Sequence, residues 1–413
     1  MNNLQIPQSE VVILRSLARR IAELAAVAEN QHKAQMWSRL TDLDHSVRPM
    51  LLTHLWELAW SQVLPDETTL LCQHETARRY ERDMRQRLWT VENLNDDTVI
   101  EPVIRYPHCV TIKPYGSLAV KKVYAGSDHS HIGAGIFLPE ITRKSDIEKL
   151  SDPIVRVDTD LREQYRRQAD EVFGDILDVI PEGIYFAAKV IDEWAELRGM
   201  AQLYLDMIDD PQWTHAALQI IADNFRSRFT QCENLGVWGP WDASDPLGST
   251  GLRFNPEIPN YPQVKQRGQL KLNESWAFTC AEAFTTVSPK MHDRFAFHYD
   301  RQLMPLFRFA NIGCCEVLSD RIDYIRSIPN ARRITVSEWA NLEKAASSIG
   351  TDFVYGYKPS GVPFISKPWN PEMVRKEIRE VLTHSRGCIV EIILNIGGTL
   401  GEDPGRQLIE WNR

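Results

Sequence analysis

Short apolar runs alternate along this chain with longer amphipathic stretches, and the alternation predicts the fold. Apolar residues recur at helical spacing between Val11 and Ala28, with Ser9 in the N-cap position. Buried strands are predicted where a short apolar run is bounded by turn residues. The candidate strands are 50–56, 98–105, 176–187, 270–276, 307–312, 332–336, 352–358 and 388–395. Helical patterns separate most of them, which is typical of a parallel sheet.

The number of strand–helix units favours one large domain. A count near eight over 413 residues predicts an α/β fold of the closed (β/α)8 TIM barrel type at 48–413, preceded by an N-terminal helical extension at 1–47. Two long loops are expected at about 106–140 and 239–265, and loops of such length are usually functional. His129 and His131 in the first loop are interpreted as polar surface rather than metal ligands.

Composition narrows the classes of partner. The net charge is −9 and the basic residues are scattered, so a nucleic-acid partner is not expected. No apolar run approaches the roughly 18 residues of a membrane helix, and the first residues lack a signal-peptide pattern. We therefore expect a cytoplasmic protein with no membrane partner. Seven irregularly spaced cysteines do not form a disulfide framework.

We expect the functional site at the end of the 307–312 strand, where Cys314, Cys315 and Glu316 follow Gly313. Thiols at the carboxyl end of a barrel strand are typical of a metal site. Buried cysteines with a packing role and a redox pair are the alternatives, although vicinal cysteines bridge only through a strained ring. Adjacent side chains on an ideal strand point to opposite faces, so only one thiol is expected to face the barrel mouth unless the strand bulges.

Other polar and aromatic residues are candidates for the same mouth. Glu274 ends the predicted 270–276 strand and could act as a catalytic acid. Glu316 is either a catalytic or ligand-orienting carboxylate or a strand-end acid in a salt bridge. Lys358 ends another predicted strand and could either bind an anionic group of the substrate or pair with an acid. Trp241, in the second long loop, could line an apolar substrate pocket.

Several segments resemble the uroporphyrinogen decarboxylase superfamily, and specifically its divergent anaerobe branch related to corrinoid-dependent methyltransferases. The most specific is Asn311-Ile-Gly-Cys-Cys-Glu316 followed by Ser327-Ile-Pro-Asn-Ala-Arg-Arg333. The others are Ile141–Leu150, Phe173–Leu177, Val287–Met291 with Tyr299 downstream, and Gly387–Glu391. The resemblance extends over nearly the whole chain and implies a (β/α)8 barrel preceded by helices.

The resemblance also implies a metal and its ligands. Methyltransferases of this superfamily hold zinc on a middle strand and on the last strand, which assigns Cys314 or Cys315 to the first place and Glu391 or Cys388 to the last. Tyr299 belongs to the resemblance as a substrate-binding candidate. Uroporphyrinogen decarboxylases have an Arg- and Gly-containing segment after the first strand, whereas this chain offers His54 and Glu57 in an apolar, aromatic mouth. A polyanionic porphyrinogen does not suit such a mouth.

The expected function follows from these residues and the resemblance. It is a zinc-dependent methyltransferase of the O-demethylase type that moves a methyl group from a small methylated substrate, such as a methoxylated aromatic, to a corrinoid (cobalamin) on a partner protein. One alternative is a lyase, a metal-free decarboxylase of the uroporphyrinogen decarboxylase type that acts on a small or tetrapyrrole-like acid, with Glu274 or a neighbouring acid as proton donor. Another is a non-catalytic corrinoid- or tetrapyrrole-binding protein. A homodimer is left open.

Overall fold

A curled, six-stranded parallel sheet organises the molecule. The computed structural model describes residues 5–116, 118, 120–124, 135–246 and 248–413; His129 and His131 lie outside these ranges. The strand order is β1-β12-β11-β10-β9-β8, and all five pairings are parallel. The strands are β1 (Met50–Leu55), β8 (Trp276–Thr279), β9 (Phe309–Ile312), β10 (Ala331–Ser337), β11 (Val354–Lys358) and β12 (Ile389–Ile396). The alternation of apolar runs and helical patterns is thereby confirmed.

The predicted closed barrel is not present in the described residues. Strands β2 (Val103–Tyr106) and β7 (Asp178–Pro181) pair only with each other, in parallel. Single bridges, Ile184 with Trp238 and Ala188 with Thr279, connect the region after β7 to the edge strand β8. Among the described residues, no strand ladder joins β1 to β2. The result is a TIM-like α/β half-barrel whose remaining wall is made of short segments.

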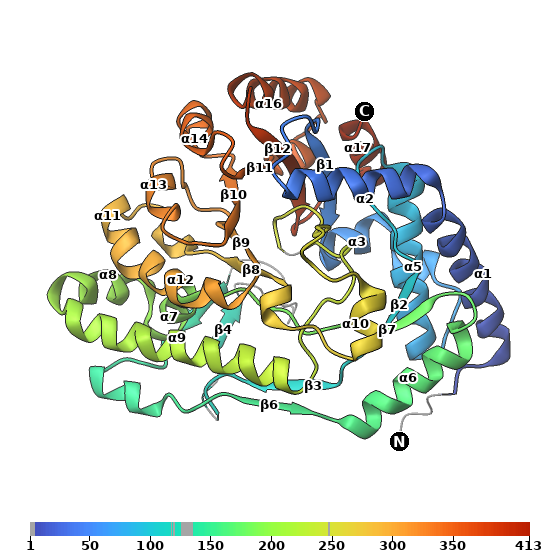
Figure 1. The fold of residues 1–413 in the computed structure, drawn as a ribbon, viewed down its shortest axis with the longest axis horizontal. Coiled ribbons are helices and arrows are strands. Elements are labelled where there is room, and N and C mark those ends of the chain that lie inside the picture. Colours follow the sequence, from blue (N-terminus) through green and yellow to red (C-terminus); the bar gives the residue numbers. More distant parts are fainter. Residues whose placement is uncertain (1–4, 117, 119, 125–134, 247) are drawn as a thin grey trace.

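Helices surround the sheet on its outer side (Figure 1). Helices α14 and α16 lie beside β10, β11 and β12, whereas α1, α5 and α6 lie together on another side of the molecule. The longer helices are α1 (Gln8–Ala25), α2 (Ala28–Thr41), α3 (Glu57–Val63), α5 (Glu75–Asn93), α6 (Thr159–Phe173), α7 (Val190–Arg198), α8 (Met200–Asp209), α9 (Pro211–Asn234), α10 (Tyr261–Arg267), α14 (Leu342–Ile349), α16 (Pro371–His384) and α17 (Pro404–Trp411). The four-to-six-residue helices are α4 (Asp66–Thr69), α11 (Pro289–His292), α12 (His298–Leu303), α13 (Ile322–Ile325) and α15 (Val362–Ile365). None of the described helices is long and apolar enough to cross a membrane.

The first long loop is more regular than its sequence predicts. Residues of the 106–140 segment form β3 (Val110–Lys113), which pairs with β6 (Ile154–Val157). They also form an antiparallel pair of β4 (Lys121–Tyr124) and β5 (Gly135–Leu138). The short strands could not be predicted from this segment, which is rich in polar residues and glycines. Such strands are stabilised by pairing with other strands rather than by their own composition.

The second long loop enters the concave side of the sheet. Arg333, which is fully buried on β10, donates to the carbonyls of Gly251 (2.9 Å) and Leu252 (2.6 Å). A Cβ at Gly251 would lie 2.3 Å from the Trp37 ring, so only glycine fits against it. The loop therefore occupies the space that side chains fill in a closed barrel, and it delivers Ser249 to the carboxyl end of the sheet.

Candidate functional site

Two thiols lie side by side where β9 ends. The Sγ atoms of Cys314 and Cys315 are 3.6 Å apart. Strand β9 stops at Ile312, and Gly313 has φ +91°, a conformation that favours glycine. The turn at Gly313 removes the strand alternation, so both adjacent side chains point the same way. The expectation that only one thiol faces the mouth is thereby corrected.

Polar groups from three other segments surround the thiols. Lys358, the last residue of β11, places its Nζ 3.0 Å from Cys315 Sγ and 3.8 Å from Cys314 Sγ. Ser249 Oγ is 3.4 Å from Cys314 Sγ, and Asn395 Nδ2 donates to Ser249 Oγ at 2.9 Å. Since β9, β11 and β12 are parallel, their carboxyl ends bring these groups to one edge of the sheet.

The site has a carboxylate, from Glu282, that can join the two thiols. Its oxygen and the sulfurs of Cys314 and Cys315 all lie within 4.8 Å of one another. Glu282 follows β8, and its backbone N–H donates to Asp192 Oδ2 at 3.1 Å. Glu282 and Cys315 are exposed and Cys314 is partly buried, so an ion bound here would keep access to solvent.

The spacing of the thiols suits a tetrahedral metal ion. Zinc–thiolate bonds of about 2.3 Å at a tetrahedral angle separate two sulfurs by about 3.8 Å. The observed separation of 3.6 Å between the sulfurs of Cys314 and Cys315 is close to that value. Two thiolates and a carboxylate leave a fourth position for a substrate atom, which is the pattern of catalytic zinc sites.

Glu316 fixes the turn that carries the thiols. Its two oxygens accept the backbone N–H groups of Ala281 (2.8 Å) and Cys314 (2.9 Å), so this carboxylate ties the ends of β8 and β9 together. Burial raises the pKa of Glu316 to about 7. Glu316 is 2% exposed, and its contacts place it behind the thiols as a positioning residue.

Hydrogen bonding sets the thiol pair apart from ordinary cysteines. The hydrogen bond between the two thiols raises the pKa of Cys314. The same hydrogen bond, together with the Lys358 ammonium, outweighs burial and lowers the pKa of Cys315 to about 7. Burial lowers the pKa of Lys358, but the two thiols and Glu282 outweigh it and the net shift is upward. Cys315 is therefore partly thiolate near neutral pH, the form that binds metals.

The structure does not bring the two candidate ligands of the last strand to the thiols. Glu391 is 1% exposed and contacts Arg333 Nε (3.4 Å) and the Gly251 N–H (3.3 Å). Cys388 precedes β12 and donates to the Ala346 carbonyl at 3.5 Å, so it lies at the amino end, opposite the thiols. The assignment of Cys388 as a ligand is wrong for this reason, and Glu391 is instead a buried ion-pair partner.

Glu274 does not lie at the expected strand end. Residues Leu272–Glu274 form a 3-10 turn before β8, which begins at Trp276. Glu274 is thus at the amino end of the strand, where it forms a double hydrogen bond with Arg267 at 2.7 and 2.8 Å. The strand predicted over 270–276 begins only at Trp276. The predicted role of Glu274 as a catalytic acid at the carboxyl end of that strand is corrected for this reason.

Two further substrate-binding candidates lie away from the thiols. Trp241 is buried in the main core, and its indole N–H donates to the Trp238 carbonyl at 3.1 Å. Tyr299 on α12 is buried, and its hydroxyl donates to the His215 carbonyl at 3.0 Å. Both side chains are engaged in structural contacts.

His54 and Glu57 lie at the carboxyl end of β1, as expected. They line a cavity of about 440 Å³ together with Trp56, Trp60 and Arg82. His54 Nδ1 is 3.4 Å from the Gly248 carbonyl, one residue before the Ser249 that contacts Cys314. This cavity therefore lies on the other side of the second long loop from the thiol pair.

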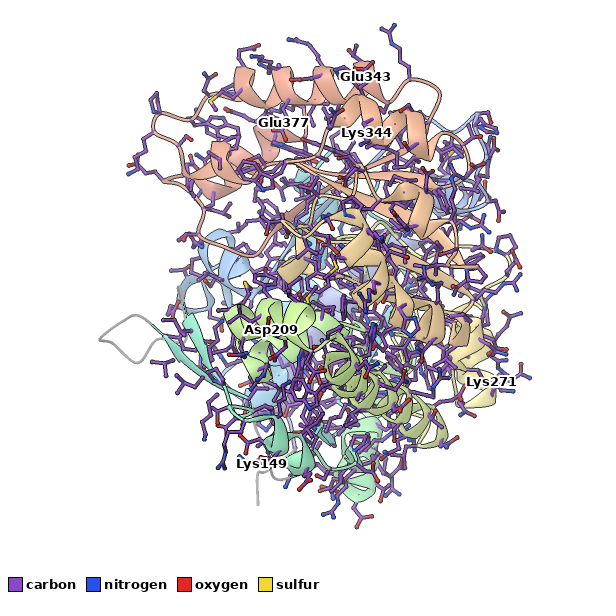
Figure 2. All side chains as sticks on the ribbon, turned by 90° about the vertical axis from the view of Figure 1, so that its left-hand side faces the viewer. Lys149, Asp209, Lys271, Glu343, Lys344 and Glu377 are labelled. Carbon is purple, nitrogen blue, oxygen red and sulfur yellow. The ribbon has the colours of Figure 1, made fainter. Side chains whose placement is uncertain are left out.

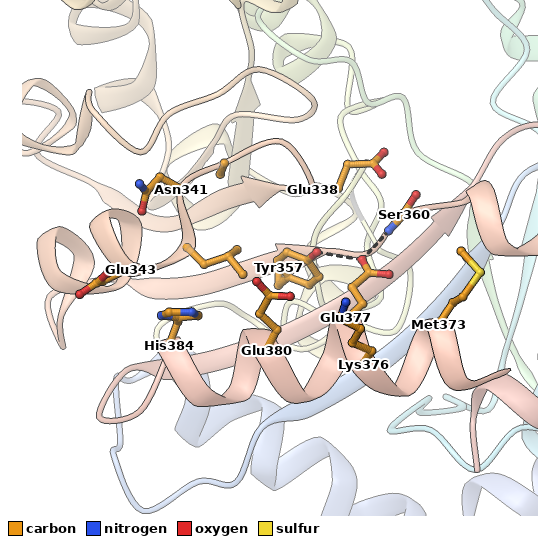
Figure 3. A pocket seen from close by; sticks show the side chains of 12 residues that line it. Glu338, Asn341, Glu343, Tyr357, Ser360, Met373, Lys376, Glu377, Glu380 and His384 are labelled. Carbon is orange, nitrogen blue, oxygen red and sulfur yellow. Dashed lines mark hydrogen bonds between the residues drawn. The ribbon is translucent and has the colours of Figure 1, made fainter. Parts of the chain in front are cut away.

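A cavity of about 610 Å³ lies on the outer side of the sheet, between β11, α14 and α16. Figure 3 shows Tyr357, Ser360 and Glu377 joined there by hydrogen bonds. The Tyr357 hydroxyl donates to Glu377 at 2.8 Å and the Ser360 N–H at 2.9 Å. Lys358, the next residue, faces the thiols instead, because side chains alternate along β11.

Sequence reasoning missed three residues of this site: Glu282, Ser249 and Asn395. Glu282 follows β8, whose predicted position was wrong, and Asn395 is the next-to-last residue of β12, with no motif around it. Ser249 comes from a loop, and no periodicity predicts where a loop folds back. Correct bounds for β8 would have placed Glu282 at a carboxyl end, whereas Asn395 already ended the predicted 388–395 strand and lacked only a motif to single it out.

Comparisons with known proteins give little beyond this geometry. No family model matches the chain, and no curated protein matches it. Among solved structures, a methyltransferase from Methanosarcina mazei superposes with a TM-score of 0.49 at 11% identity, covering 92% of this chain and 98% of that one. At this identity the chemistry is to be inferred from the side chains themselves.

Proposed function

We propose that the protein is a zinc-dependent methyltransferase, with the metal held by Cys314, Cys315 and Glu282. The observation that supports this most directly is the 3.6 Å separation of two thiols beside a carboxylate, at the carboxyl end of a parallel sheet. The methyl donor is a small methylated compound. The acceptor is a corrinoid carried by a partner protein, as the resemblance implies.

The chemistry required is the breaking of a bond between a methyl group and oxygen, sulfur or nitrogen. The methyl carbon forms its new bond to the two-electron nucleophile, and the heteroatom keeps the electron pair of the broken bond. Zinc would stabilise that developing charge as a Lewis acid. Lys358, whose ammonium lies 3.0 Å from Cys315, would add positive charge at the same place.

The position of Glu274 argues against the lyase alternative in which this residue is the proton donor. Glu274 was the acid proposed for it, and this carboxylate is paired with Arg267 at the amino end of β8. The placement of Glu274 therefore favours the methyltransferase over a decarboxylase that uses this residue.

Metal content of the purified full-length protein tests the proposal. We expect about one zinc per chain in the wild type. Cys314→Ser, Cys315→Ser and Glu282→Gln should each bind it at least about tenfold more weakly, because each removes one ligand. Glu391→Gln is the matched control: it also removes a carboxylate charge, but from the Arg333 ion pair. It should keep its zinc.

Methyl transfer is then measured with the zinc-loaded wild type, a methylated donor and free cob(I)alamin. Loss of zinc on Glu391→Gln but not on Glu282→Gln would overturn the ligand set. Failure of the reduced wild-type protein to bind zinc at all would overturn the proposed function.

A further inference from the structure

A cavity of about 490 Å³ lies between α9 and the helical segment that consists of α11, the π-helical turn Asp293–Phe297 and α12. Its lining comes from His215 and Gln219 on α9 and from side chains of the segment 290–301. The two thiols and Glu282 are not among the described residues that line it. A ligand bound here therefore does not depend on the proposed function.

The lining carries more positive than negative charge. Among the described residues, Lys290, Arg294 and Arg301 line the cavity together with a single carboxylate, Asp293. Arg301 donates to Asp293 Oδ1 at 2.8 Å, so this carboxylate already has a partner. Lys290 and Arg294 form no hydrogen bond or ion pair within the part of the chain that the structure describes. Two cations without a carboxylate partner therefore line the cavity.

The basic side chains are aligned along one face of the helical segment. Lys290, Arg294 and His298 follow one another at intervals of four residues, and side chains at this spacing are neighbours on a helix surface. All three are exposed. Like charges at this spacing destabilise a helix, so Lys290 and Arg294 repel each other until an anion lies between them. Arg294 also lies in the π-helical turn, a rare feature that is frequent at functional sites.

The opposite wall is subject to the same positive charge. The ring of His215 lies 5.6 Å from that of His298, between ring centres. Burial lowers the pKa of His215, and the charges of His298 and Arg294 lower it further. None of these groups is a carboxylate. Asp223, the first acid within α9, accepts a hydrogen bond from Gln219 at 3.0 Å and does not line the cavity.

We propose that this cavity binds the phosphate group of a small phosphorylated molecule. A phosphate monoester carries about two negative charges at pH 7, which matches the two cations without a partner, whereas a carboxylate would match only one. Arginine and lysine are the side chains that most often bind phosphate. A volume of about 490 Å³ is in the range of pockets that hold whole small molecules, so the organic part of the ester has room beside the rings of His215 and His298.

Three probes test this proposal: phenyl phosphate, benzoate and inorganic phosphate. Their binding to the full-length protein is measured by calorimetry. We expect phenyl phosphate to bind about threefold more tightly than benzoate, because it forms one more exposed ion pair. It should also bind more tightly than inorganic phosphate, because its ring contacts the cavity wall. Equal affinities for the three probes, or no binding of phenyl phosphate, would overturn the proposal.

The variants Lys290→Met and Arg294→Met should each weaken the binding of phenyl phosphate about threefold, and the double variant about tenfold. Lys271→Met is the matched control, because Lys271 is an exposed lysine on the outside of the molecule (Figure 2). Its neighbour Leu272 donates to Glu233 at the end of α9, whereas the cavity lies near the start of this helix. Equal weakening in the control would show only a general attraction to cationic surface and would overturn the proposal.

Thermal unfolding separates a loss of binding from a loss of fold. Phenyl phosphate should raise the Tm of the wild type but not that of the double variant, and circular dichroism checks that both fold. An equal rise in the double variant would overturn the proposal. Cys314→Ser should bind phenyl phosphate as the wild type does, so failure of the zinc site and failure of this site are distinguishable.

Discussion

The ammonium of Lys358 lies 3.0 Å from the sulfur of Cys315, and this contact joins the ends of β11 and β9. Together with the hydrogen bond from Cys314, it lowers the pKa of Cys315 to about 7. Because the thiolate is the reactive form of a cysteine and the form that would bind the proposed metal, the lysine increases the share of that form at neutral pH.

Lys358→Met should slow the alkylation of Cys315 in the metal-free protein. The hydrogen bond from Cys314 remains in the variant, so the pKa of Cys315 should rise only part of the way to its ordinary value. We expect iodoacetamide to react about three- to tenfold more slowly at pH 7, since the rate follows the thiolate fraction. Mass spectrometry of the labelled peptide measures the rate.

The matched control for this rate is Lys376→Met on α16, which is not among the residues that contact the thiols. An unchanged alkylation rate in Lys358→Met would show that the lysine does not act on Cys315.

Gly313→Ala should destabilise the fold. Gly313 has φ +91°, and an added Cβ would lie 2.4 Å from Leu318 Cδ1. The leucine methyl can move, so the cost comes mainly from backbone strain, about 1–3 kcal/mol of the free energy of unfolding. Urea denaturation measures it. Gly361→Ala is the control, since no atom lies within 4 Å of the added Cβ and the φ of Gly361 is −79°. An equal loss of stability in this control would show that the backbone conformation of Gly313 is not the cause.

Asp300→Asn should flatten the pH dependence of stability. Burial raises the pKa of Asp300 to about 7, above the roughly 3.9 of an unfolded aspartate. Between these values the folded protein holds an extra proton, so stability falls as pH rises, by about 1.4 kcal/mol per pH unit. In the variant this contribution disappears, and stability at pH 7 to 8 should increase.

Asn at position 300 can still accept the hydrogen bond that Thr279 donates to Asp300 at 2.7 Å, so packing is preserved. Urea denaturation at pH 5, 6, 7 and 8 measures the slope. Asp323→Asn, with a side chain 93% exposed, is the control and should follow the wild type. Glu316, with a pKa of about 7 for the same reason, should retain part of the slope in Asp300→Asn. A slope identical to that of the wild type would contradict the prediction.

The strand pattern was predictable where the strands are strongly apolar. Strands β1, β9, β10, β11 and β12 lie within one or two residues of the predicted runs. The 270–276 strand was misplaced because the alternation of Leu270 and Leu272 with polar residues resembles a strand, whereas β8 forms in the apolar run Trp276–Thr279 that follows Asn273, Glu274 and Ser275. Because of this shift of a few residues, Glu274 was predicted at the carboxyl end of the strand although it lies at the amino end, and Glu282 at the true carboxyl end was not identified.

The sequence by itself determined a parallel α/β fold and put two thiols, a carboxylate and a lysine at predicted strand ends. These are local properties, since apolar periodicity and turn residues act over a few positions. Only the tertiary structure decided that Gly313 turns both thiols to one side, that Glu282 and not Cys388 lies beside them, and that a loop fills the half-barrel. Each of these depends on contacts between residues distant along the chain, and such contacts leave no periodic signal in the sequence.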